Sequence, residues 1–262
     1  RYGTSGRIPH LPGAMQQIPA RSTESPFRVY DFLIVFAITL GVSFFGVVVA
    51  FILSPPDSLD VTGILSDPAF LGISLASQWI GSIAGLFVLK AIRSASIEDF
   101  GLPITGADAR GIFWGLGAVG GLIVFGLIVE SSGVDAPSQD LVASFENIQG
   151  PLWTAAAVLG VGVVGPLTEE LLYRGVLQGS LARRYAPMPT IVITSLIFAA
   201  VHFQGGNFIT VLFVLLGPIF LLSLVLGWLV EKDNGRIGRA FFMHATYNSI
   251  QVILLFSGVA EG

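Results

Sequence analysis

Long apolar segments alternate with short polar stretches from residue 29 to the end of this chain. Most of these segments reach the roughly 20 residues that an α-helix needs to cross a bilayer core of about 30 Å. The fifth segment is short for a span. The pattern predicts an all-α fold, a multi-pass transmembrane helical bundle of about seven spans. The segments cover residues 29–53, 69–92, 110–130, 152–177, 188–203, 207–230 and 237–257.

Residues 1–27 differ from the rest of the chain, because they are polar and contain four prolines. A segment of this kind buries little apolar surface, so it is predicted to be a flexible N-terminal tail. Residues 28–262 are predicted to form one integral-membrane domain. The motifs described below lie between residues 166 and 248 of that domain.

Lys and Arg residues predict the topology independently of the apolar pattern. Cytoplasmic loops of membrane proteins carry an excess of these residues. In this chain they precede the first predicted span and then occupy or bracket alternate loops, and Arg174 alone is left over, within one of the motifs described below. The pattern predicts a multi-pass protein of the cell membrane with its N-terminus inside and its C-terminus outside. The loop residues are Arg1, Arg7, Arg21, Arg28, Lys90, Arg93, Arg110, Arg183, Arg184, Lys232, Arg236 and Arg239.

Composition agrees with a membrane protein and excludes several function classes. Charged residues make up 11% of the chain, whereas soluble domains carry about 25%. The net charge is −4 and no basic cluster is present, so a nucleic-acid partner is not expected. The chain has no cysteine, which excludes a thiol nucleophile, a thiolate metal ligand and any disulfide.

Glycines at regular spacing mark sites where helices are expected to pack closely. Two pairs in the third segment have the four-residue spacing that lets helix backbones approach each other. Gly160, Gly162 and Gly165 match a dinucleotide-binding pattern, but no predicted strand precedes them, so helix packing is the better interpretation. The two pairs are Gly111 with Gly115 and Gly117 with Gly121.

Three short polar patterns interrupt the apolar second half: E-E-x-x-x-R at 169–174, F-x-x-x-H at 198–202 and H-x-x-x-N at 244–248. An Asp, Lys or Arg at mid-helix costs about 2.5–3.5 kcal/mol in lipid, so ionisable residues in spans usually face a bundle interior or a water cavity. Pro166 lacks an N–H and is expected to kink the helix and open space beside the carboxylates. The patterns together predict a buried active site.

The first pattern separates its two carboxylates. Glu170 and Arg174 are four residues apart, with the acid first, which favours an ion pair on one helix face. Glu169 is turned by about 100° from Glu170 on an α-helix of 3.6 residues per turn, and we expect it to face a cavity with Tyr173 on its side. A buried charge cluster that only fixes helix register is the structural alternative. One carboxylate would suffice for that role, so the second favours a function.

The other two patterns place polar groups on two further helices. Phe198 and His202 share a helix face, where the ring is expected to screen the imidazole from lipid. His244 and Asn248 share a face of the last segment and offer hydrogen-bond donors about 6 Å apart along the axis. Structural alternatives are a lone satisfied histidine and an asparagine that joins two helices.

The order of these patterns on separate spans resembles the CPBP family, which includes the type II CAAX prenyl endopeptidases and the bacteriocin-processing proteins. The resemblance covers residues 166–248, and all three patterns are intact. It implies an all-helical intramembrane protease, with residues 28–262 as the peptidase domain. The expected partners are the lipid bilayer and a membrane-associated protein or peptide substrate, with or without a lipid anchor.

The resemblance also implies roles for individual residues. Glu169 would act as general base on a water molecule, and His202 would help to position or activate that water. His244 and Asn248 would form the oxyanion site, and Arg174, paired with Glu170, would keep the base aligned. Fixed donors of this kind stabilise charge that develops during attack on an amide.

Two alternatives remain open from the sequence. Glu169, His202 and His244 match the ligand set of a catalytic zinc site with two histidines and one glutamate. A mechanism without a metal or other cofactor is preferred, because Asn248 fits an oxyanion donor better than a zinc ligand. The second alternative is a non-catalytic membrane scaffold or a proton-coupled transporter, since buried carboxylates and histidines also serve as proton relays.

Overall fold

The computed structural model describes residues 25–53, 55, 67–133, 151–203 and 210–257. Every element in these ranges is a helix, as the apolar pattern predicts, and most of the predicted N-terminal tail lies outside them. The elements are α1 (Val29–Leu53), α3 (Pro68–Arg93), η1 (Glu98–Phe100), η2 (Gly106–Arg110), α4 (Gly111–Ser131), α6 (Pro151–Leu159), η3 (Gly160–Val164), α7 (Gly165–Glu169), η4 (Glu170–Gln178), α8 (Gly179–Leu181), α9 (Pro187–Ala200), η5 (Val211–Leu216), α11 (Gly217–Lys232) and α12 (Gly238–Phe256).

Each predicted apolar segment corresponds to one helix or one run of consecutive helices. Within the described residues, five helical stretches are long and apolar enough to cross a membrane. The short fifth segment forms α9, which has 14 residues and is not one of the five, and neither is α12. The five stretches are Val29–Leu53, Pro68–Arg93, Gly106–Ser131, Thr154–Leu181 and Val211–Lys232.

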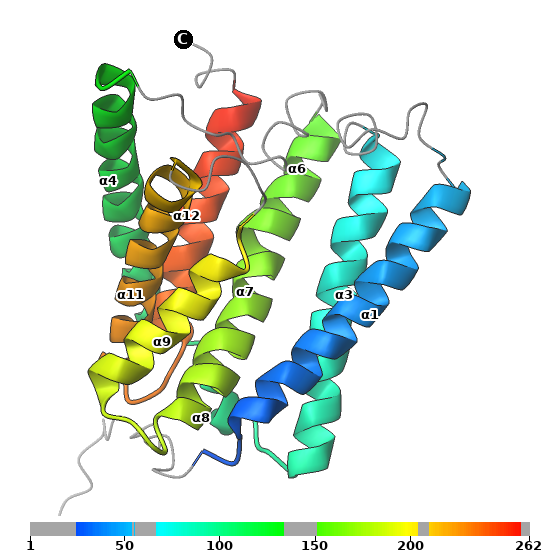
Figure 1. The fold of residues 1–262 in the computed structure, drawn as a ribbon, viewed down its shortest axis with the longest axis vertical. Helices are drawn as coiled ribbons and strands as arrows, with labels where there is room; N and C mark the ends of the chain where they lie inside the picture. Colours follow the sequence, from blue (N-terminus) through cyan, green and yellow to red (C-terminus); the bar gives the residue numbers. More distant parts are fainter. Residues whose placement is uncertain (1–24, 54, 56–66, 134–150, 204–209, 258–262) are drawn as a thin grey trace, which may run out of the picture.

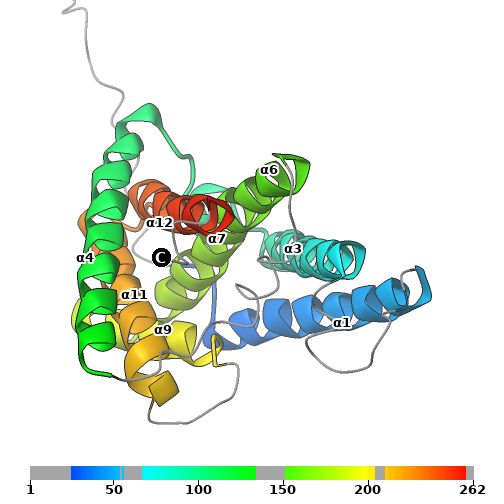
Figure 2. The ribbon, with the colours of Figure 1, turned by 90° about the horizontal axis from the view of Figure 1, so that it is seen from above.

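The run from α6 to α8 lies in the middle of the bundle (Figures 1 and 2). The antiparallel pair α1 and α3 lies on one side of it, and α4, α11 and α12 lie on the other. A cluster of buried apolar side chains joins α1, α3, η4 and α9, and a second joins α4, α11 and α12. The middle run therefore contacts both halves of the bundle, and it carries the first of the three polar patterns.

The basic residues gather at one end of the bundle, which we call the basic end. α1, α4, α9 and α12 begin there, and α3, α8 and α11 end there (Figure 1). Three ion pairs lie at this end: Asp31 with Arg93, Asp108 with Arg236, and Asp233 with Arg239. The predicted segregation of charge is thus present in the fold, and the assignment of this end to the cytoplasm stays a prediction.

Glycine permits close packing at some of the predicted positions but not at all of them. A Cβ at Gly115 would lie 2.6 Å from Cβ of Thr246, and one at Gly111 would meet the Arg239 carbonyl, so α4 and α12 touch along this pair. At Gly117 and Gly121, by contrast, an added Cβ would meet no atom of the described residues within 4 Å. The second predicted pair is therefore wrong, because that face of α4 turns away from α12.

Candidate active site

The middle helix leaves α-helical geometry just before the two glutamates. In η3, a π-helical stretch, the Gly165 N–H donates to the carbonyl of Gly160, five residues back. The Val161 carbonyl, whose α-helical donor would be Gly165, therefore loses that partner. The α-helical donor of the Gly162 carbonyl would be residue 166, and this donor is missing because Pro166 has no N–H. Single π-helical turns occur often at functional sites.

Side chains of α12 replace these missing backbone donors. Asn248 Nδ2 donates to the Val161 carbonyl over 3.1 Å. Ser249 Oγ donates to the Gly162 carbonyl over 3.3 Å, and Gly162 has no room for a Cβ beside Ser249. The predicted disturbance at Pro166 thus takes the form of a π-helical turn, whose freed carbonyls hold α12 against the middle helix.

A second, longer π-helical stretch, η4, carries most of the first pattern. It covers Glu170–Gln178, so the α-helical geometry predicted for this stretch is wrong. The predicted ion pair nevertheless forms within it: Arg174 Nε lies 3.5 Å from Glu170 Oε2. Both side chains are fully buried.

Buried Glu170 also binds a histidine of α12. Its Oε1 lies 2.9 Å from His244 Nδ1, and the His244 side chain is only 3% exposed. The sequence placed Glu170 with Arg174 and His244 with Asn248, and it missed this link between the first and third patterns. Glu170 therefore joins a guanidinium on its own helix to an imidazole on another.

Arg174 is also held by residues of two other helices. Its Nη2 donates to Ser223 Oγ over 2.9 Å and to the Ser223 carbonyl over 3.3 Å, so it also ties η4 to α11. Its guanidinium carbon lies 4.7 Å from the centre of the Phe198 ring. A cation over an aromatic face contributes about 2 kcal/mol or more when desolvated. Nothing in the sequence pattern marked Ser223.

Glu169 occupies a different environment from Glu170. Its side chain is 30% exposed, and its Oε2 lies 3.6 Å from His244 Nε2. His244 thus lies between the two carboxylates, with one ring nitrogen facing each. The prediction that the two glutamates point to different surroundings is confirmed by this difference in exposure.

Phe198 lies among the motif side chains, between His202, His244 and Tyr173, rather than on their lipid side. Its ring is 1% exposed and contacts the rings of His202, His244 and Tyr173 at centroid distances of 4.7, 5.8 and 5.0 Å. The predicted role as a screen toward lipid is therefore wrong. Tyr173 packs its ring against Phe198 and, at 5.4 Å, against Phe32.

His202 follows the end of α9 and is partly exposed. Its Nδ1 lies 2.7 Å from the Phe198 carbonyl. A carbonyl can only accept, so Nδ1 carries the hydrogen, and in the neutral ring Nε2 keeps its lone pair. The motif F-x-x-x-H thus fixes both the orientation and the tautomer of His202 through the phenylalanine backbone.

The residues of the alternative zinc site do not form a ligand cluster. No group of three or more His, Asp or Glu residues in the described ranges is placed to hold a metal ion. The arrangement therefore gives the predicted zinc set of Glu169, His202 and His244 no support.

Comparison with known proteins shows what the part of the chain that holds this site is similar to. Residues 151–250 match the family model described as type II CAAX prenyl endopeptidase Rce1-like. The UPF0177 protein YxdF of Lactococcus lactis subsp. lactis (strain IL1403) is 28% identical over 158 residues, which cover 58% of this chain and 78% of that protein. No solved structure matches. Residues 151–250, which hold all three polar patterns, are thus similar to the Rce1-like type II CAAX prenyl endopeptidases.

Proposed function

We propose that this protein is an intramembrane endopeptidase that hydrolyses a peptide bond with water activated by Glu169. The observation that carries the proposal is the unequal surroundings of the two neighbouring carboxylates. Glu170 is fully buried and bound by Arg174 and His244, whereas Glu169 is 30% exposed beside His244 Nε2. Glu169 is thus the carboxylate that water and substrate can reach.

His244 is suited to stabilise the negative charge that forms on the substrate carbonyl. Glu170 accepts from Nδ1 and fixes the ring, so Nε2 is directed toward Glu169. With a charged imidazole, the two carboxylates are balanced by Arg174 and His244, and the cluster is formally neutral. Nε2 then carries a hydrogen that can be donated to an oxyanion formed next to Glu169.

The proposed reaction proceeds in two steps. Glu169 removes a proton from water while the water oxygen attacks the carbonyl carbon, and the carbonyl oxygen becomes an oxyanion beside His244. The oxyanion then re-forms the carbonyl and the C–N bond breaks, and the departing amine takes the proton from Glu169. A positioned base of this kind contributes a factor of about 10² to 10⁴.

His202 and Asn248 take supporting parts in the proposal. His202 Nε2 is free to accept a hydrogen bond from the attacking water, because Nδ1 is held by the Phe198 carbonyl. Asn248 uses one of its two N–H groups on the Val161 carbonyl and keeps the other for the oxyanion. Asn248 would then both join the helices and serve the reaction.

The substrate in this proposal is a membrane-associated protein or peptide of the cell membrane, with or without a lipid anchor. The partly exposed Glu169 lies on the middle helix of an apolar bundle, so the scissile bond must approach within or next to the bilayer. No metal or other cofactor enters the proposed steps.

Quantitative proteomics of protein termini would test the activity. Membranes from cells producing the wild type are compared with membranes containing Glu169→Gln, which keeps the side-chain volume and removes the base. We expect one or more uncut peptides to accumulate only with the variant. Lys90→Gln, a polar substitution remote from the cluster, serves as the control and should cut normally. An unchanged set of termini, with the variant folded and present at wild-type levels, would contradict the proposed function.

A further inference from the structure

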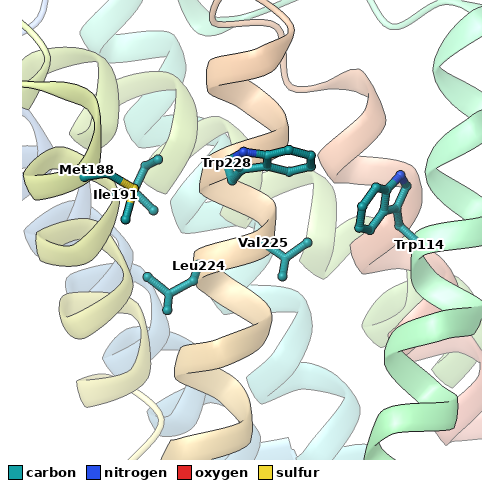
Figure 3. Close-up of a pocket in the computed structure, with 6 residues that line it drawn as sticks. All are labelled: Trp114, Met188, Ile191, Leu224, Val225 and Trp228. Atoms are coloured by element: carbon teal, nitrogen blue, oxygen red, sulfur yellow. The ribbon is translucent and has the colours of Figure 1, made fainter.

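An apolar groove opens between α4, α9 and α11 (Figure 3). None of the polar residues around Glu170 lines it. Its volume is about 370 Å³. Figure 3 shows Met188 and Ile191 on α9, Trp114 on α4, and three side chains of α11 between them. The lining residues are Trp114, Met188, Ile191, Leu224, Val225 and Trp228.

The groove lies close to the basic end of the bundle. Trp114 is the fourth residue of α4, Met188 is the second residue of α9, and Trp228 is four residues from the end of α11. The two indole rings are in contact, with centroids 5.5 Å apart. They remain 42% and 38% exposed. Tryptophan is enriched at the level of lipid headgroups, so the groove runs from that level into the apolar zone.

Cationic side chains lie around the end of the groove that is nearest to the headgroups. Lys232 Nζ is 5.8 Å from the centre of the Trp228 ring. Arg110 precedes Trp114 by four residues, which is one helical turn, and Arg184 lies in the turn that leads into α9. Glu231 is exposed beside Lys232, so these four residues carry a formal charge of +2.

These cations differ from three other basic residues at the same end. Arg93, Arg236 and Arg239 are each neutralised by an aspartate. Across the described part of the chain, Arg110, Arg184 and Lys232 take part in no ion pair. Their charge is therefore available to an anionic group that reaches the groove from the bilayer.

We infer that this groove binds an anionic phospholipid. One acyl chain lies along the apolar lining, and the headgroup phosphate is held by Lys232, Arg110 and Arg184. Basic pockets between transmembrane helices recognise anionic headgroups in this way. Trp228 contributes to both the acyl-chain site and the headgroup site, since its ring lines the groove and also lies under the Lys232 ammonium.

Native mass spectrometry of the whole purified protein tests this inference without reference to peptidase activity. We expect the wild type to retain one phosphatidylglycerol in preference to phosphatidylcholine with the same acyl chains. In Arg110→Gln/Lys232→Gln the preference should fall by about tenfold or more, because each basic residue near an anionic surface contributes roughly a factor of five. Arg28→Gln/Lys90→Gln removes the same charge from the α1–α3 side of the bundle and should keep the preference.

Other outcomes would overturn the inference. Equal binding of the two lipids by the wild type would show no anionic site. An equal loss in both double variants would show general attraction of anionic lipid to the basic end. If Arg110→Gln/Lys232→Gln does not fold, dibromo-acyl lipids test the wild type directly: dibromo-phosphatidylglycerol should quench tryptophan fluorescence more than dibromo-phosphatidylcholine, and the excess should vanish in Trp114→Phe/Trp228→Phe. Equal quenching of the wild type would contradict the site.

Discussion

Removal of the buried guanidinium of Arg174 should destabilise the protein severely. Arg174→Met keeps much of the side-chain volume but leaves Glu170 without its cation. Both partners are fully buried, with Nε and Oε2 3.5 Å apart. Breaking a buried ion pair by removing one partner costs about 3–5 kcal/mol. The bond to Ser223 is lost as well, which adds about 1.5 kcal/mol if it behaves as an ordinary hydrogen bond to a charged group.

The cost should shrink when the remaining charge is also removed. In Arg174→Met/Glu170→Gln no unpaired carboxylate is left, so the double variant should be more stable than the two single losses would predict if they were additive. Arg239→Met supplies a matched control, because its pair with Asp233 is partly exposed and such pairs contribute about 1 kcal/mol or less.

Equilibrium unfolding of the purified proteins in mixed detergent micelles measures these differences. The account predicts that Arg174→Met loses several times more stability than Arg239→Met and that Glu170→Gln restores part of the loss. Equal losses of stability in Arg174→Met and Arg239→Met would refute the reasoning. Strict additivity of Glu170→Gln and Arg174→Met would show that the two side chains are not energetically coupled.

Individual contacts give three further predictions. Gly162→Ala should destabilise the protein because its Cβ meets Ser249, and Ser249→Gly should restore part of the loss in the same unfolding assay; destabilisation that Ser249→Gly leaves unchanged would place the clash elsewhere. Phe198→Leu removes the ring between His202, His244 and Arg174, so cleavage should fall while the protein stays folded, and cleavage at the wild-type rate would contradict a central role for the ring. A chelator should leave the rate of the purified enzyme unchanged, and loss of cleavage that zinc restores would instead support the metalloprotease alternative.

The sequence predicts those parts of the fold that depend on local pattern. Apolar segments of the right length indicated the helices, and the spacing of Glu170 and Arg174 indicated their ion pair, which forms even in a π-helix because both geometries keep these residues on one side. The separate surroundings of Glu169 followed from the same spacing. The local spacing of Gly111 and Gly115 likewise predicted the contact between α4 and α12 correctly.

The contacts that the sequence missed all depend on which helices become neighbours. The bonds from Glu170 to His244 and from Arg174 to Ser223 join residues 74 and 49 positions apart, and no local period encodes them. An asparagine that joins two helices was one of the sequence alternatives for Asn248, but its partner, the Val161 carbonyl, could not be predicted because that bond requires the π-helical turn of η3. Pro166 was the available signal, since a residue without an N–H must leave a carbonyl for another group to satisfy.

The central claim is that the Glu169 carboxylate is the base of a peptide hydrolysis. The most direct measurement compares kcat/KM of the wild type, Glu169→Gln and Glu169→Asp in proteoliposomes, with a peptide that carries a cleavage site found by terminal proteomics. The account predicts a fall of about 10² to 10⁴ for Glu169→Gln, mainly in kcat, and partial activity for Glu169→Asp, because only the second variant keeps a carboxylate. A Glu169→Gln enzyme that cleaves within a few-fold of the wild-type rate would contradict the claim.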